Sequence, residues 1–307
     1  MEKLRLALDW TPNVNHIGFL VAKELGFYHQ QGIELEIQSP QEDNYAITPA
    51  KKLELRMADL AIAPSETVIS FNNKPNRVEV IAIYAILQED LSCIVTLQSS
   101  NITSPRQLDG KTYASYKARY EDHIVREMIK NDGGKGEINI IYPEKLGIWN
   151  TVIDGKADAT WIFDNWEGIE ASGKNIALNK FMLRNYGIPY GYSPVVLVRR
   201  ENLMTNKSLY AQFVKASRAG FLFVKDNLKE AISILEPYVT PYDLANINLE
   251  KALAFTIPYF GNEATCGMMN SEQVTKFLEW IVARGLENEA ILKQDLFTNE
   301  VFAFATA

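Results

Sequence analysis

Strand-like and helix-like stretches alternate from the start of this chain, and this alternation constrains its fold more than any other feature. Short apolar runs occur at Leu4–Leu8, Asp59–Ala63 and Val78–Ala85. Between them, Phe19–Tyr28 and Glu66–Phe71 show the spacing of apolar residues that is typical of helices. A series of strands separated by helices predicts a mostly parallel sheet flanked by helices. We therefore expect an α/β protein.

A second series of the same kind follows, with strand-like runs at Ser92–Leu97, Thr112–Ser115 and Ala157–Phe163. A chain of 307 residues is long enough for two lobes, because single hydrophobic cores stop growing near ~250–300 residues. We expect residues 1–90 and 198–307 to form lobe 1, and residues 91–197 to form lobe 2 as an insertion. A cleft between two lobes is a favoured place for a small-molecule site.

The predicted first strand ends in a turn of unusual composition. Residues 8–18 read Leu-Asp-Trp-Thr-Pro-Asn-Val-Asn-His-Ile-Gly. Ligands of open α/β sheets bind beyond the carboxyl ends of the strands. The indole of Trp10 offers a flat face for stacking, and the amide of Asn13 can match the polar edge of a nitrogen-rich heterocycle. Two roles are open for Asn13, Asn15 and His16: a ligand contact, or a structural one in the turn backbone or the cap of the following helix.

This turn and the segment Val-Ala-Lys-Glu-Leu-Gly-Phe-Tyr that follows at residues 21–28 resemble the start of a known group of proteins. These are the thiamine-pyrimidine chains with the type II periplasmic-binding-protein fold, and the resemblance is strongest in residues 4–36 and 154–198. One branch comprises solute-binding proteins of ABC transporters that capture pyrimidine precursors or breakdown products of thiamine. The other comprises thiamine-pyrimidine synthases, which consume their own histidine and bound pyridoxal phosphate. The resemblance implies two lobes with a ligand cleft between them, and a ring-stacking role for Trp10.

Three departures separate this chain from the synthase branch. The lysine that binds pyridoxal phosphate and the consumed histidine correspond to Ala63 and Thr67, which supply neither an amine nor an imidazole. A run of cysteines associated with iron is replaced by Tyr-Gly-Tyr-Ser at residues 190–193, which has no evident iron ligand. We therefore expect a binding protein that uses no cofactor. Pyridoxal phosphate and iron belong only to the alternative, a synthase-like enzyme.

Two aromatic segments supply further candidate contacts, each with a structural alternative. Glu167 begins a helix beside Trp161 and Trp166, where a carboxylate can accept paired hydrogen bonds from an aminopyrimidine. At least one of these rings is expected to belong to the core. Tyr190 and Tyr192 lie in an irregular Gly- and Pro-containing segment, which suits the rim of a cleft or a packed loop.

Residues 115–121, Ser-Tyr-Lys-Ala-Arg-Tyr-Glu, lie between a predicted strand and a predicted helix, where binding proteins hold anionic or carbonyl groups. Lys117 and Arg119 add charge for a phosphate or carboxylate, or else form an exposed basic patch. The glycine-rich phosphate turn of the synthases is missing, which argues against phosphate binding. The predicted ligand-binding residues are Trp10, Asn13, His16, Ser65, Tyr84, Ser115, Tyr116, Arg119, Trp161, Trp166, Glu167, Tyr190 and Tyr192.

Composition and net charge limit the classes of partner that we expect for this chain. A net charge of −7 argues against a nucleic-acid partner, which needs a basic face. No apolar stretch approaches the ~20 residues of a membrane span, and the histidines and cysteines show no zinc-like spacing. Cys93 and Cys266 are interpreted as isolated buried residues. Met1 leads directly into the first strand, so the chain is expected to be cytoplasmic if Met1 is native, and periplasmic or tethered outside the cell if a leader was removed.

We therefore expect a monomeric solute-binding protein that recognises a thiamine-related aminopyrimidine and performs no chemistry. The resemblance implies the membrane component of an ABC transporter as its partner. Two alternatives stay open: the synthase-like enzyme, and a binding protein for another small anion such as a sulfonate or an aromatic acid.

Overall fold

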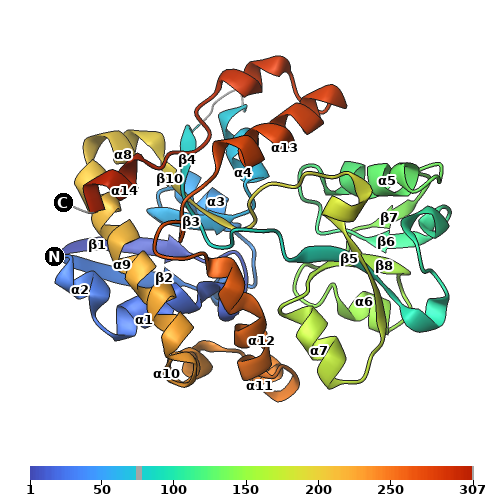
Figure 1. Cartoon of the computed structure of the whole chain (residues 1–307), viewed down its shortest axis with the longest axis horizontal. Helices are drawn as coiled ribbons and strands as arrows, with labels where there is room; N and C mark the ends of the chain where they lie inside the picture. Colours follow the sequence, from blue (N-terminus) through green and yellow to red (C-terminus); the bar gives the residue numbers. More distant parts are fainter. Residues whose placement is uncertain (74–77, 306–307) are drawn as a thin grey trace.

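The computed structural model describes residues 1–73 and 78–305. Within them, the named strands form two five-stranded sheets that lie side by side along the long axis of the molecule (Figure 1). The first sheet has the order β2-β1-β3-β10-β4 and the second has the order β7-β6-β8-β5-β9. The strands of the first are β1 (Glu2–Ala7), β2 (Ile33–Gln38), β3 (Leu60–Ala63), β4 (Val80–Ala85) and β10 (Val195–Arg199). The strands of the second are β5 (Ser92–Leu97), β6 (Thr112–Ala114), β7 (Asn139–Ile141), β8 (Ala159–Phe163) and β9 (Leu178–Met182).

Both sheets contain one antiparallel strand, and the other four strands of each run in the same direction, so the sheets are mostly parallel as predicted. Strand β1 runs parallel to β2 and β3, and β6 runs parallel to β7 and β8. Strand β10 is antiparallel to both of its neighbours, and so is β5. These two strands each enter their sheet directly from the other lobe. A strand that enters at the edge where its neighbours end has to run opposite to them.

The chain passes from the first sheet to the second between β4 and β5, and returns between β9 and β10. The predicted lobe boundary at residues 90–91 falls in the first of these passages. Strand β10 belongs to the first sheet and begins at Val195, three residues before the predicted second boundary.

Helices cover both sheets. Those of the first lobe include α1 (Ile17–Glu24), α2 (Phe27–Gln30), α3 (Pro49–Glu54) and α4 (Glu66–Asn72). The long C-terminal part of the chain adds α8 (Arg200–Thr205), α9 (Lys207–Asp226), α10 (Leu228–Leu235), α11 (Pro241–Asn246), α12 (Leu249–Thr256), α13 (Ser271–Ala283) and α14 (Glu300–Ala305). The second lobe has α5 (Glu121–Asn131), α6 (Asn150–Ile153) and α7 (Glu167–Gly173). The helical stretch predicted at residues 19–28, with an end near Gly26, forms α1 and α2, because Gly26 adopts a left-handed conformation between them.

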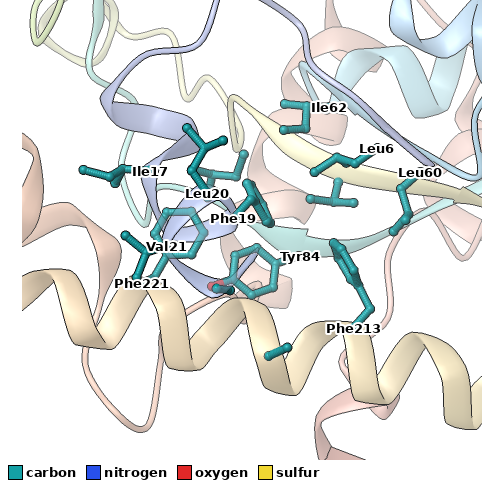
Figure 2. Packing of buried hydrophobic residues seen from close by; sticks show 14 of the residues in the cluster. Leu6, Ile17, Phe19, Leu20, Val21, Leu60, Ile62, Tyr84, Phe213 and Phe221 are labelled. Carbon is teal, nitrogen blue, oxygen red and sulfur yellow. The ribbon is translucent and has the colours of Figure 1, made fainter. Parts of the chain in front are cut away.

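The core of the first lobe lies between its sheet and the pair α1 and α9. Figure 2 shows Phe19 of α1 packed among Tyr84, Phe213 and Phe221, and its ring centroid lies 5.0 Å from that of Phe221. The two helices approach closely at Gly220, where an added Cβ would lie 2.0 Å from the carbonyl oxygen of Gly18. This contact fixes the position of α1, and with it the turn that precedes α1.

Tyr84 belongs to this core and does not reach the cleft, contrary to the sequence-based expectation. Its side chain is fully buried, and its hydroxyl lies 3.2 Å from the Sγ of Cys266. Its ring faces Phe19 and Phe221 on the helix-covered side of the sheet (Figure 2). Being near the carboxyl end of a strand does not bring a side chain to the cleft if it points to a covered face. Cys93 and Cys266 are both buried and free, as predicted.

Candidate functional site: the cleft between the lobes

A cavity of ≈ 440 Å³ lies between the two lobes and is lined by residues of both. This volume is within the range of ~300–1,000 Å³ that is usual for small-molecule sites. In the first lobe its walls come from the segments that follow β1, β2 and β3, and in the second from those that follow β6, β7 and β8; the segment between β9 and β10 adds to the lining. These are carboxyl ends of parallel strands, which is where the sequence predicted a site.

The two sheet orders place the site residues at equivalent positions. Strands β1 and β3 stand second and third in one sheet, as β6 and β8 do in the other. Trp10 follows β1 and Tyr116 follows β6, while Glu66 follows β3 and Glu167 follows β8. All four line the cavity. Each lobe therefore contributes aromatic rings and carboxyl groups from corresponding turns.

The rings around Trp10 come from both lobes. The centroid of Trp10 lies 6.0 Å from that of Tyr45 in its own lobe and 6.0 Å from that of Tyr116 across the cleft. The contact with Tyr116 is edge to face. A planar guest held between two rings needs ~3.5–4.0 Å on each side, so these two rings leave no slot between them. A ligand that stacks on Trp10 therefore uses its other face, or the lobes separate first.

Two further rings line the second-lobe wall. Trp161 of β8 and Tyr190 lie with their centroids 5.3 Å apart, edge to face. Both are half-buried, whereas Trp166 is 3% exposed and joins the core of the first lobe while still lining the cavity. The predicted rings from distant segments thus meet in one cleft, and one of them serves mainly as core.

Hydrogen bonds within the turn 8–18 hold Trp10 in place. The Asn13 N–H donates to Nδ1 of His16 over 3.2 Å, and the Asn15 N–H donates to Oδ1 of Asn13 over 2.8 Å. Because Nδ1 of His16 accepts, Nε2 carries the proton and donates to Asp9 over 2.8 Å. His16 is 1% exposed and does not line the cavity. Of its two predicted roles, the structure therefore assigns it the cap.

Asn13 lines the cavity, but its amide is engaged within the turn. Its Oδ1 accepts from Asn15, and its Nδ2 donates to the carbonyl oxygen of Thr11 over 3.0 Å. Asn15 and Tyr45, which are not among the predicted ligand-binding residues, also line the cavity. The Nζ of Lys145 lies 5.1 Å from the centroid of the Tyr45 ring, and burial lowers the pKa of the Lys145 amine.

Two buried carboxyl groups face the cavity. Glu66 is 3% exposed, and its Oε2 accepts a hydrogen bond of 2.6 Å from the Tyr190 hydroxyl. Within the described residues, Oε1 of Glu66 has no hydrogen-bond partner. Burial raises the pKa of Glu66 to about 7, although the bond from Tyr190 opposes this shift. The sequence analysis missed Glu66 and chose its neighbour Ser65; the match with Glu167 in the other lobe was the signal that could have found it.

Glu167 lines the cavity from the second lobe, at the start of α7, and is 9% exposed. Its Oε2 accepts a hydrogen bond of 3.0 Å from the Phe163 N–H. Burial raises its pKa to about 7, and backbone hydrogen bonds from Glu167 and Phe163 only partly oppose this. A carboxyl group with a pKa near neutrality can accept hydrogen bonds when ionised and donate one when protonated.

The loop after β6 surrounds a third carboxyl group, that of Glu121. Its Oε1 accepts from the Tyr113 hydroxyl over 2.8 Å and from the Tyr116 N–H over 3.1 Å, and its Oε2 accepts from the Ala118 N–H over 3.1 Å. Glu121 is 2% exposed and lines the cavity. Burial raises its pKa, against the effect of these three donors.

The two basic residues of this loop, Lys117 and Arg119, line the cavity and also contact other side chains. Arg119 lines the cavity, but its guanidinium pairs with Glu287, to which Nε donates over 2.8 Å. The Nζ of Lys117 lies 5.3 Å from the ring centroid of Tyr142. Ser115, predicted as a contact, is 1% exposed and does not line the cavity. Its Oγ donates to Asp122 over 2.7 Å instead.

Ser65 and Tyr192 also lie outside the cleft. Both line a separate cavity of ≈ 30 Å³ beside α13. The Ser65 N–H donates to the carbonyl oxygen of Tyr192 over 3.1 Å, and the Tyr192 hydroxyl accepts from the Asn270 N–H over 2.8 Å. Ser65 precedes α4 without a side-chain capping bond, and Glu66 after it turns towards the cleft.

The positions that the resemblance assigns to synthase chemistry do lie at the cleft. Ala63 and Thr67 both line the cavity. Neither side chain can form a Schiff base with pyridoxal phosphate. The N–H groups of Tyr116 and Ala118, where the synthases bind phosphate, already donate to Glu121. The residues present therefore do not fit that cofactor. Among the described residues, no group of three or more His, Cys, Asp or Glu side chains is arranged to hold a metal ion.

Known proteins resemble this chain in sequence and in fold. A formylaminopyrimidine-binding protein of Halalkalibacterium halodurans is 23% identical over 97% of this chain and 90% of its own length. The riboflavin-binding protein RibY of Chloroflexus aurantiacus is 22% identical over 98% of this chain and 86% of its own. The alkanesulfonate-binding protein SsuA from Xanthomonas axonopodis pv. citri has a TM-score of 0.71 at 13% identity, covering 97% of this chain and 98% of that one.

The structural likeness confirms the predicted periplasmic-binding-protein fold with two α/β lobes. The family described as NMT1/THI5 like matches residues 13–231, which is more than half of the chain. The turn at residues 8–18, on which the predicted kinship was based, begins just before this match and runs into it. The chain therefore belongs to the NMT1/THI5-like family.

Proposed function

We propose that this chain is a solute-binding protein that recognises a thiamine-related aminopyrimidine, either a precursor or a degradation product, and releases it unaltered. The observation that carries the proposal is the meeting of Trp10, Tyr116 and Trp161 with two buried carboxyl groups in the cleft between the lobes. Aromatic rings bind the faces of a planar base, and carboxyl groups accept hydrogen bonds from its amino edge. The relative that binds formylaminopyrimidine, by its name, supports this ligand class.

Glu167 is the proposed partner of the amino group. It is buried and faces the cavity from the lobe opposite Trp10. If the lobes close on a base that is stacked on Trp10, a carboxyl group from the other lobe can accept hydrogen bonds from the amino edge of that base. Binding energy is then available only in the closed form, which is how hinge closure traps a ligand.

Two other functions are less well supported. A synthase needs an amine and an imidazole where this chain has Ala63 and Thr67 on the cleft wall. An anion-binding protein needs an excess of positive charge in its cleft. Lys117, Arg119 and Lys145 line the cavity, but Arg119 is paired with Glu287. Four acidic side chains line the same cavity: Asp9, Glu66, Glu121 and Glu167. We therefore propose binding without chemistry and without a cofactor.

An ABC-type importer is the proposed partner, and the compartment is proposed to be the one outside the cytoplasmic membrane. Solute-binding relatives with the same fold support both proposals. No helix among the described residues has the length and apolar character needed to cross a bilayer.

The decisive experiment is titration calorimetry with 4-amino-5-hydroxymethyl-2-methylpyrimidine, riboflavin and the sulfonate buffer MOPS as three ligands. We expect binding of the aminopyrimidine and none of MOPS. Native mass spectrometry of the purified protein gives the mass of any ligand carried through purification. Binding of MOPS in preference to the pyrimidine, or a yellow protein with pyridoxal phosphate bound to a lysine, contradicts the proposal.

A further inference from the structure

The loop between β6 and α5 has the form of an anion site whose donors already serve a side chain of the protein. The N–H groups of Tyr116 and Ala118 converge, with the Tyr113 hydroxyl, on the two oxygens of Glu121. Both oxygens accept hydrogen bonds, which is the role of an ionised carboxylate. The same carboxylate lines the cavity, so its charge is presented to whatever binds there.

The N–H group between those of Tyr116 and Ala118, that of Lys117, is also used within the loop. The Lys117 N–H donates to the Oγ of Ser115 over 3.0 Å, and that hydroxyl donates to Asp122. Among the described residues, the backbone N–H groups of Tyr116, Lys117 and Ala118 are thus all satisfied internally. A phosphate or sulfonate entering here would have to displace a buried carboxylate, and would meet its negative charge before doing so.

The opposite wall carries a second buried carboxyl group, that of Glu66, which is 3% exposed and lines the cavity. Its Oε1 has no hydrogen-bond partner within the described residues. Because burial raises the pKa of this group to about 7, it can accept a hydrogen bond from a ligand when ionised and donate one when protonated. The exclusion of anions therefore depends on Glu121 rather than on Glu66.

We propose that Glu121 is a specificity-determining residue: its carboxylate fills the anion subsite of the cleft, so that the protein selects unphosphorylated, neutral or cationic pyrimidines and rejects their phosphate esters. This inference deepens the proposed function and rests on it only for the identity of the neutral ligand. The effect on anions follows from the loop itself and can be tested without any pyrimidine.

The first test is chemical rescue. Glu121→Ala leaves the N–H groups of Tyr116 and Ala118 without an acceptor, so added acetate or phosphate should raise its melting temperature above that in chloride of equal ionic strength. The wild type should show no such difference. Asp122→Ala is the matched control, because it removes the same charge from the same helical turn. The carboxylate of Asp122 accepts hydrogen bonds from the hydroxyls of Ser115 and Tyr142, so its loss leaves no backbone N–H of the loop without its acceptor. An equal response of Glu121→Ala and Asp122→Ala to these anions overturns the proposal.

The second test measures selectivity by calorimetry. The wild type should bind 4-amino-5-hydroxymethyl-2-methylpyrimidine at least ~100-fold more tightly than its phosphate ester, because like charges brought together in an interface cost several kcal/mol. Glu121→Gln keeps an oxygen to accept hydrogen bonds from the loop and removes the charge. It therefore tests the role of the charge even if Glu121→Ala does not fold. It should reduce this ratio by ~10-fold or more. A wild type that binds both forms equally refutes the role of Glu121, whereas failure to bind either form refutes only the proposed function.

Discussion

The pH dependence of stability offers a direct test of the buried carboxyl group of Glu66. Its pKa is raised from 4.5 to about 7 by burial, with only the Tyr190 hydroxyl as a hydrogen-bond donor among the described residues. Below pH ~4.5 the group is protonated in both the folded and the unfolded chain and has no effect. Between pH 4.5 and about pH 7 the unfolded chain loses the proton of Glu66 and the folded chain keeps it, so the free energy of unfolding falls as pH rises.

The size of this loss follows from the shift. A difference of about 2.5 pKa units, from 4.5 to about 7, corresponds to about 3 kcal/mol of lost stability above pH ~7. Glu66→Gln removes the titration and keeps an oxygen to accept from Tyr190. Relative to the wild type, the variant should therefore gain about 3 kcal/mol between pH 4.5 and pH 8.

The assay is urea unfolding followed by tryptophan fluorescence at half-unit steps of pH, with the free energy of unfolding extrapolated at each. Glu34→Gln, on the exposed face of β2, is the control with the same change of formal charge. It should follow the wild-type curve. If the curves of the wild type and Glu66→Gln run parallel from pH 4.5 to pH 8, then Glu66 ionises in the folded chain as it does in water and the argument from burial fails.

Three further predictions concern the cleft and its support. Trp10→Ala should weaken binding of the aminopyrimidine by ~5- to 150-fold, since stacking of a base on an aromatic ring contributes ~1–3 kcal/mol, and should leave the melting temperature nearly unchanged; unaltered affinity in calorimetry would remove Trp10 from the site. Glu167→Gln should weaken the same binding, with the larger loss at high pH, where the wild-type carboxyl with its pKa of about 7 is ionised; a loss that does not vary between pH 5.5 and pH 8.5 contradicts this role. Gly220→Ala should destabilise the fold by ~3 kcal/mol or more in denaturant titration, because its Cβ would lie 2.0 Å from the carbonyl oxygen of Gly18, while Gly173→Ala, whose Cβ meets only an atom 3.7 Å away, should have little effect; equal stability of the two variants would show that α1 and α9 shift to accept the methyl group.

Much of the site was predictable because turn chemistry is local. The ring and amides at residues 8–18, the Trp and Glu at 166 and 167, and the tyrosine at 190 stand in segments whose composition is unusual for loops, and the structure brings residues from all three to one cleft. The antiparallel entry of β5 and β10 was not predictable in the same way. An apolar run has the same composition in either direction, and the direction depends on which lobe the chain comes from.

The errors at single positions have a common geometrical cause. Successive residues of a helix point ~100° apart, so that of the neighbours Ser65 and Glu66 only one faces the cleft. Tyr84 was misplaced for the corresponding reason in a strand, where the side chain points to one covered face of the sheet.

By itself, the sequence determined that this chain forms two α/β lobes, that its ring-bearing turns lie at strand ends, and that it lacks the lysine and the histidine of the synthases. These features are local or compositional, so predicting them does not require knowing which way each side chain of a helix points. Only the tertiary structure decided that Glu66 and Glu167 line the same cavity from different lobes and that Glu121 satisfies the loop in which an anion would bind. Such facts depend on the direction in which each side chain points after distant segments have packed, and periodicity alone leaves that direction open.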